Sequence, residues 1–221
     1  MFKKLFLTAA ILLSLPLTSR AQWSVGLLGG ADCNMHSQDN HYMTDYRFRG
    51  AAGMNFGLSG QYAFNDWLAV RADLTFTQKN YQFTRNLVKE VDHHYLNNYL
   101  LLPVMASFRF GEGRVHGFAN AGVYGGYWLS CSRHGKDWGS VSGQVFEFAE
   151  NLPFNTERDN RLDAGLVGGL GIEYSFSPNW AAQIEARGYY SPVSQVKQYM
   201  RIHDYRYDTT LVLQAAVYYR F

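Results

Sequence analysis

Five charged residues are candidates for chemistry because they recur on otherwise apolar segments: Arg71, Asp73, Glu173, Glu185 and Arg187. Residues two apart on an extended strand face the same side, so Arg71 and Asp73 share a face, as do Glu185 and Arg187. Each of the five lies about four to eight residues from a predicted short turn, which indicates a similar depth. Acids and bases at one depth predict an ion-paired network.

Histidines are the next candidates, because imidazole binds transition metals. Six of them fall in segments that we interpret as loops: His36, His41, His93, His94, His134 and His203. The adjacent His93 and His94 point to opposite sides of an extended chain, and no HExxH motif is present. We therefore predict solvated loop histidines, with no metal site and no cofactor.

Two cysteines, Cys33 and Cys131, complete the reactive side chains. An exported chain permits a disulfide between them, although nothing in their spacing requires one. Both states stay open at this stage. Without a CxxC pair, a structural zinc site is not predicted.

The first residues predict export. Lys3 and Lys4 precede the apolar run Leu5–Leu15, and Ser19-Arg20-Ala21 places small residues at the positions that signal peptidase reads. We expect residues 1–21 to be a cleaved signal peptide and residues 22–221 to form one domain. Cleavage would expose Gln22, which does not predict a lipoprotein.

The composition of the mature chain favours β-structure. The full sequence contains 16 Tyr, 15 Phe, 5 Trp and 21 Gly, and aromatic residues favour strands while glycine marks turns and close backbone approaches. After removal of residues 1–21, 17 basic residues face 18 acidic residues. This balance gives no support to a nucleic-acid partner.

Apolar and polar residues alternate along most of the chain. Leu162 to Phe176 alternates over about fifteen residues, longer than the ~5–6 of an ordinary strand. Similar alternation covers five further segments, 54–64, 68–76, 100–110, 180–190 and 209–221, and weaker patterns cover 23–31 and 115–129. For 115–129 we assign Val115, Ala119, Ala121 and Val123 to the outside, and His116, Asn120 and Tyr124 to the inside. The sequence thus predicts eight strands.

The connections alternate in length. Tight turns are predicted near Asn65, Gly111 and Pro178, and long polar loops over 32–51, 78–95, 131–160 and 191–208. An up-and-down barrel in an outer membrane has short periplasmic turns and long outer loops. The apolar faces carry no charge, so we assign them to lipid and the charged faces to a filled lumen. Aromatic residues near the short turns fit an interfacial girdle.

The long loop 131–160 permits two interpretations that the sequence does not rank. Its aromatic residues, including Trp138, Phe146 and Phe148, fit a segment that covers the barrel mouth or binds a protein. Val145–Phe148 also fits a hairpin that extends the barrel wall.

Three segments resemble the small outer-membrane β-barrels of Bacteroidota called PorT-like, within the OmpA/OmpX-type eight-stranded barrels. They are Tyr99–Pro103, Arg161–Glu173 and Tyr218–Phe221. The resemblance implies the barrel fold, the outer membrane, and recognition of the last strand with its terminal Phe221 by the barrel-assembly machinery. It implies no activity. Pro103 cannot donate to a β-ladder, so we expect a bulge or local break there.

We therefore predict an all-β protein, an eight-stranded antiparallel up-and-down transmembrane β-barrel with both termini in the periplasm. Its expected role is structural or protein-interacting and non-enzymatic, with membership of a larger outer-membrane complex as one candidate. Expected partners are outer-membrane lipids, the assembly machinery and other outer-membrane proteins. The alternatives are a narrow channel and a lipid A-modifying enzyme, for which His203 with Ser191 or Ser194 is a conceivable base and nucleophile. No nucleophile elbow supports a catalytic residue.

Overall fold

A computed structural model describes residues 22–38, 44–139, 142–197 and 205–221. The expected signal peptide and His203 lie outside these residues. The described residues form ten strands: β1 (Gln22–Gln38), β2 (Tyr46–Ala63), β3 (Leu68–Gln78), β4 (Tyr81–Arg85), β5 (Asp92–Phe110), β6 (Val115–Trp138), β7 (Val145–Leu152), β8 (Leu162–Ser175), β9 (Trp180–Tyr190) and β10 (Arg206–Arg220). They contain no helix long and apolar enough to cross a membrane.

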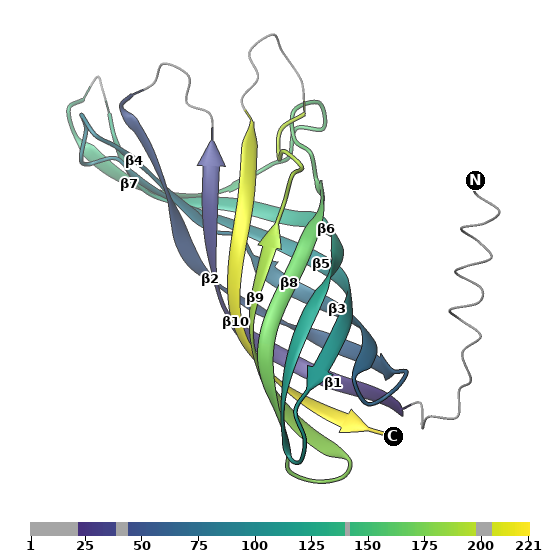
Figure 1. The fold of residues 1–221 in the computed structure, drawn as a ribbon. Helices are drawn as coiled ribbons and strands as arrows, with labels where there is room; N and C mark the ends of the chain where they lie inside the picture. The colour runs from purple at the N-terminus through teal and green to yellow at the C-terminus, as the bar shows by residue number, and fades with distance from the viewer. Residues whose placement is uncertain (1–21, 39–43, 140–141, 198–204) are drawn as a thin grey trace, which may run out of the picture.

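Eight of the strands close into a barrel (Figure 1). Neighbours pair antiparallel in the order β1, β2, β3, β5, β6, β8, β9 and β10, and β10 pairs back to β1 through a register that includes Leu27↔Val217. The predicted up-and-down antiparallel barrel is confirmed. The strand expected over 180–190 matches β9, and the one expected over 162–176 matches β8 to within one residue.

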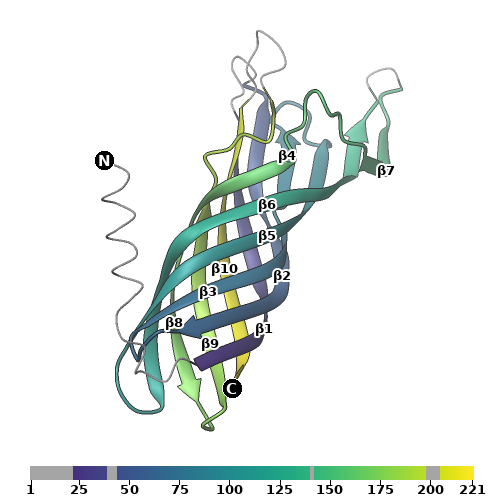
Figure 2. The same ribbon diagram turned by 90° about the vertical axis from the view of Figure 1, so that its right-hand side faces the viewer.

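The other two strands, β4 and β7, continue the wall beyond the closed part. β4 pairs with β2 and β5 above β3, and β7 pairs with the last residues of β6. The loops expected over 78–95 and 131–160 are therefore largely strands, because β5 begins at Asp92 and β6 runs to Trp138. Of the two interpretations of Val145–Phe148, the hairpin is the one found. Figures 1 and 2 show these strands flaring away from the barrel axis at one end.

Alternation along each strand sorts side chains between two environments. Apolar side chains point outward, with exposed fractions of 66% for Leu27, 58% for Leu58 and 64% for Ile184. Charged residues at the intervening positions are buried, including Arg71 and Glu185. On β6, Val123 is exposed while Asn120 and Tyr124 are buried. An apolar outer surface around a polar interior is the arrangement of a barrel whose solvent is lipid.

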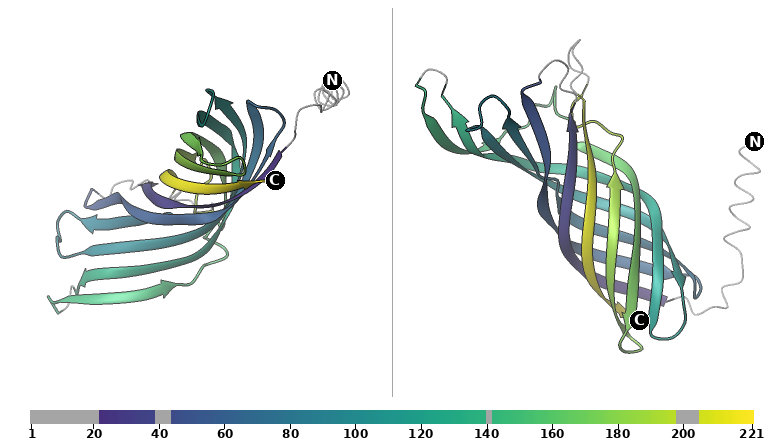
Figure 3. Two further views of the ribbon diagram at one scale, coloured as in Figure 1. Left: turned by 90° about the horizontal axis from the view of Figure 1, so that it is seen from below. Right: turned by 60° about the vertical axis from the view of Figure 1, so that its left-hand side comes forward.

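Tight turns join strands at one end of the barrel. At Asn65 the side-chain oxygen accepts hydrogen bonds from the backbone N–H of Trp67 (3.1 Å) and Leu68 (2.7 Å). The β5–β6 turn places Gly111 and Gly113 at φ of 98° and 86°, where a side chain would be strained. The strands that the longer connections join have their other ends at the opposite end of the barrel, which we call the long-loop end (Figure 3, right).

Pro103 lies inside β5 and opposite Tyr124 of β6. The expected break occurs on its other side: pairing of β3 with β5 runs to Ala72↔Val104 and resumes at Thr75↔Leu101. A register shift between β5 and β6 falls at Asn98/Tyr99, near the long-loop end. This shift brings Cys131 to the inner face, next to Trp128 in the core.

Candidate functional site

Four of the five predicted charges form a closed ring inside the barrel, which we call the lumen ring. Arg71 contacts Asp73 (Nε to Oδ1, 2.9 Å) and Glu185 (Nη1 to Oε2, 3.0 Å). Arg187 contacts the same two acids, Asp73 (Nη1 to Oδ2, 2.8 Å) and Glu185 (Nη2 to Oε2, 2.8 Å). Each guanidinium therefore binds both carboxylates, the geometry in which buried charges compensate one another.

The strand order makes the lumen ring span the barrel. Arg71 and Asp73 lie on β3, and Glu185 and Arg187 lie on β9, four places away around the closed sheet. Strands four apart in an eight-strand barrel are diametrically opposite. The side chains are almost inaccessible, with side-chain exposures of 0–2%. The ring therefore crosses the lumen from one wall to the opposite wall.

Neutral side chains add further hydrogen bonds to the lumen ring. Ser59 donates to Asp73 and accepts from Tyr218 (OH to Oγ, 2.7 Å). Asn120 and Gln214 donate to Glu185 at 2.8 and 2.9 Å. Satisfied partners of this kind are what make a buried ionic network tolerable.

Glu173, the fifth predicted residue, lies nearer the tight turns. It accepts a hydrogen bond from Gln183 (2.7 Å). Its carboxylate also forms ion pairs with Arg109 (3.3 Å) and Arg220. Gln183 also accepts a hydrogen bond from Arg71 (3.3 Å), so Glu173 is linked to the lumen ring through one side chain.

A second buried polar group, which we call the mouth cluster, lies toward the long-loop end: Lys79, Asp163, Ser191, Asp208 and His36. Lys79 contacts Asp163 (Nζ to Oδ2, 2.6 Å), and Ser191 donates to Asp163 (2.6 Å). Asp208 accepts from Asn34 (3.0 Å) and contacts Nδ1 of His36 at 2.9 Å. Sequence reasoning missed this group because four of its members, Lys79, Ser191, Asp208 and His36, fall in expected loops, while Asp163 falls in an expected strand. The residues next to Lys79 in the sequence do not indicate that this lysine is buried.

The serines of the catalytic alternative are engaged elsewhere. Ser191 is buried and donates to Asp163 rather than to a histidine. Ser194 accepts from the backbone N–H of Val196 and Arg206, each at 3.2 Å. Its proposed base, His203, lies outside the described residues. His36 stacks on Tyr81 at a centroid distance of 4.0 Å.

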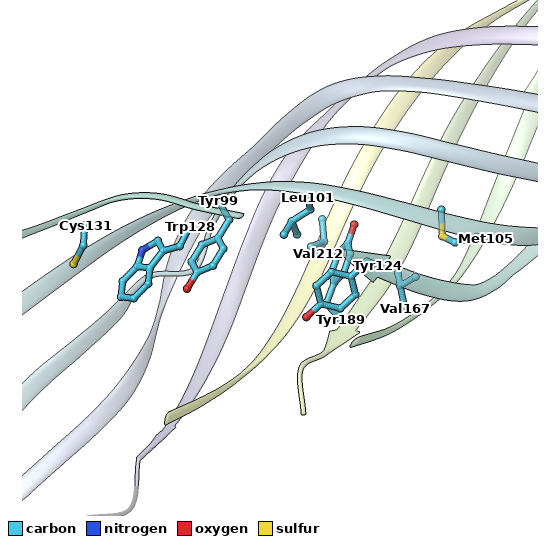
Figure 4. Close-up of a cluster of buried hydrophobic side chains, with 9 residues drawn as sticks. All are labelled: Tyr99, Leu101, Met105, Tyr124, Trp128, Cys131, Val167, Tyr189 and Val212. Carbon is cyan, nitrogen blue, oxygen red and sulfur yellow. The ribbon is translucent and has the colours of Figure 1, made fainter. Parts of the chain in front are cut away.

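A cluster of apolar side chains lies inside the barrel wall and extends from the depth of the lumen ring toward the long-loop end (Figure 4). This cluster comprises Tyr99, Leu101, Met105, Tyr124, Trp128, Cys131, Val167, Tyr189 and Val212. Tyr99 stacks on Trp128 at 5.7 Å, and Tyr124 meets Tyr189 edge-on at 5.1 Å. Lys79 lies over the rings of Tyr99 and Tyr124 at 5.0 and 5.4 Å, which joins this cluster to the mouth cluster.

Beyond the closed barrel, five strand segments form what we call the rim sheet: residues 46–50, β4, residues 92–95, residues 131–138 and β7. One face is aromatic. Tyr81 stacks on Tyr95 at 4.6 Å, and Phe148 meets His93 edge-on at 4.9 Å. The other face is polar, with Lys136 paired to Glu147 (3.4 Å).

Burial within the rim sheet affects His93. Its ring lies against Phe83 and Phe148, and this desolvation lowers the pKa of His93 below the ordinary value of 6.5. The carboxylate of Asp137, 3.5 Å away, opposes the shift without cancelling it.

The two cysteines are free thiols. Cys33 is exposed on the outer surface of β1, whereas Cys131 is buried in the apolar cluster. Because they occupy opposite faces of the wall, the disulfide considered from the sequence is not formed.

The remaining sequence candidates are placed as follows. Phe221 is 69% exposed, and its backbone N–H donates to the carbonyl of Trp23 (3.0 Å) at the barrel closure. Within the described ranges, no group of three His, Cys, Asp or Glu side chains is arranged to hold a metal ion. His94 and His134 stack at 5.4 Å on the polar face of the rim sheet.

Comparison with known proteins identifies the family. A family model described as an outer membrane protein beta-barrel domain matches residues 17–198. The chain belongs to this family. It is accordingly a β-barrel of the bacterial outer membrane, as its apolar outer wall requires. A search of curated proteins gave no match.

Solved structures of outer-membrane proteins are similar to this chain at low sequence identity. The outer membrane protein OprG from Pseudomonas aeruginosa is 14% identical, with 93% of this chain and 99% of that chain covered and a TM-score of 0.52. Ail of Yersinia pestis is 18% identical, covering 91% and 99%, with a TM-score of 0.44. The outer membrane protease OmpT from Escherichia coli is 8% identical, covering 94% and 99%, with a TM-score of 0.45. The likeness to OprG concerns the fold alone.

Proposed function

We propose that this barrel is a non-enzymatic interaction protein, which holds its rim sheet outside the cell to bind other proteins and serves as a subunit of a larger outer-membrane complex. The lumen ring carries the proposal: ion pairs that cross the full width of the barrel, with apolar side chains above them, leave no path for a solute. A barrel of this size has room only for such filling.

The proposal includes an orientation. We place the tight turns and both termini in the periplasm and the rim sheet outside, since outer-membrane barrels have short periplasmic and long external connections. A cleaved signal peptide over residues 1–21 and membership of the PorT-like group of Bacteroidota belong to the same proposal. They are supported by the basic and apolar residues before Ala21, and by the Tyr99–Pro103 and Tyr218–Phe221 segments.

The bonding of the candidate serines supports a non-catalytic role. A hydrolytic serine needs a base within hydrogen-bond reach of its hydroxyl. Ser191 instead lies against Asp163, which is itself paired with Lys79.

Two measurements test the proposal against its alternatives. Purified protein in liposomes should give no solute-driven swelling above protein-free vesicles, and flux above that control would favour a channel. Mass spectrometry of lipid A should give the same species from cells with and without the gene, whereas a gene-dependent species would favour an enzyme.

Interaction is tested in intact cells. Crosslinking followed by native purification should recover a reproducible assembly larger than the monomer. Strictly monomeric protein under the same crosslinking would contradict the interaction role.

A further inference from the structure

The outermost strand of the rim sheet, β7, has one paired edge and one open edge. Its register with β6 runs without interruption from Trp138↔Val145 to Cys131↔Leu152. On its other side, no strand of the described residues pairs with β7. The neighbouring strand β8 pairs with β6 only over residues 115–127 of β6. Seen from below, β7 forms the free margin of the sheet (Figure 3, left). Alternate residues of an edge strand direct N–H and C=O groups outward, unpaired.

β7 is held in strand conformation before any partner arrives. Phe148 anchors its aromatic face, with the Arg133 guanidinium 4.8 Å from the ring centre. Arg133 also pairs with Glu150, and Lys136 pairs with Glu147. A preformed strand spares an incoming chain part of the entropy cost of ordering.

Several of the usual protections of an edge strand are missing from β7, although Glu147 and Glu150 are charged. Natural sheets block edge-to-edge association with proline, lysine, bulges or very short strands. The sequence Val145-Phe-Glu-Phe-Ala-Glu-Asn-Leu152 contains neither proline nor lysine, and its pairing with β6 has no bulge. β7 is eight residues long, longer than the average strand of ~5–6.

Side chains of β7 indicate what an added strand would carry. Phe146 and Phe148 lie on the aromatic face, and Phe146 is 50% exposed. Glu147 lies on the polar face with its side chain 79% exposed. A neighbouring strand would therefore place apolar residues beside the phenylalanines and a basic residue beside Glu147.

We propose that the open edge of β7 binds an extended polypeptide segment of another protein, which adds to the rim sheet as a further strand with alternating apolar and basic residues. The unpaired backbone groups of β7 favour a ligand in an extended conformation, and Glu147 favours basic residues in that ligand. This inference rests on the proposed interaction function and names its surface.

The test uses full-length protein in lipid nanodiscs and fluorescent peptides of the same length as β7. A peptide alternating valine and lysine should bind, and one alternating valine and glutamate should bind at least about tenfold more weakly. Two further versions carry N-methyl groups on all valines or on all lysines, and each blocks one hydrogen-bonding edge of the peptide. Strand addition uses a single edge, so exactly one methylated version should lose binding. Equal behaviour of the two versions would overturn the proposal.

Matched variants locate the site. Glu147→Lys should weaken binding of the valine–lysine peptide by about tenfold, while Glu157→Lys, the same charge change in the exposed segment after β7, should leave it unchanged. Equal loss in both variants would mean non-specific charge attraction and would overturn the site. Concentration-dependent dimers in place of peptide binding would assign the edge to a second copy, also against the proposal. Solute flux or altered lipid A would reject the proposed function, whereas this assay reports on β7 alone.

Discussion

Glu185 is the residue on which the lumen ring depends. Four side chains converge on its carboxylate: Arg71, Arg187, Asn120 and Gln214. Removal of one member of a buried ion network leaves the others charged without compensation.

We predict that Glu185→Gln lowers the free energy of unfolding by about 3–5 kcal/mol, the cost of breaking a buried ion pair. Urea unfolding of the refolded barrel in micelles measures this, with Glu112→Gln at the exposed β5–β6 turn as the control. Because Glu112 is exposed, its substitution should change stability by less than ~0.5 kcal/mol. Equal unfolding midpoints for the two variants would contradict the structural role of the ring.

At the scale of elements, β5 and β6 approach closely because Gly122 has no side chain. A Cβ at Gly122 would collide with the backbone of Val104 and Met105, whereas a Cβ at Gly125 would meet nothing within 4 Å. Gly122 therefore allows the close approach of β5 and β6, whereas the position of Gly125 has room for a side chain.

Gly122→Ala should lower stability by about 1–3 kcal/mol through overpacking, and Gly125→Ala should be tolerated. The fraction of protein that migrates as the folded form in gels without heating measures both variants. Normal folding of Gly122→Ala would show that the two strands can separate at no cost.

The rim sheet should respond to pH through His93. Its lowered pKa means that the closed sheet favours neutral imidazole, while an opened sheet binds a proton near pH 6.5. The opened form thus binds more protons, so stability of the rim sheet is fully present above about pH 6.5 and is lost as the pH falls below it.

Hydrogen-exchange protection of β5–β7 amides, corrected for intrinsic rates, should therefore decrease between about pH 7.5 and about pH 5.5. His93→Gln removes the titrating group and should flatten this dependence. His134→Gln, on the polar face, should retain it. If both variants behave like the native protein, another group controls the rim sheet.

At the scale of the whole molecule, the even number of wall-forming strands brings the first and last described residues to the same end. Phe221 donates to the carbonyl of Trp23, so both ends of the wall meet beside the tight turns. The proposed function places this end of the barrel in the periplasm.

We predict that an epitope tag inserted after Lys89, in the exposed β4–β5 turn, is labelled by antibody on intact cells. A tag after Phe221 should be labelled only after the outer membrane is permeabilised. Labelling of the C-terminal tag on intact cells would reverse the orientation.

The sequence alone determined the wall of the barrel. Alternation with period two is a local property, so the spans of β8 and β9, the lipid-facing side of Leu58 or Ile184, and the inward direction of Arg71 and Glu185 could all be predicted. The tight turn at Asn65 was equally local.

Only the tertiary structure decided what lies across the barrel. Arg71 pairs with Glu185 although 114 positions separate them in the sequence. Lys79 is buried where its ammonium group pairs with Asp163, which lies on a strand distant in the sequence. The register shift between β5 and β6 at Asn98/Tyr99, which turns Cys131 inward, likewise depends on the pairing of the two strands. Register between distant strands is fixed by closure of the whole sheet, a condition that no local pattern contains.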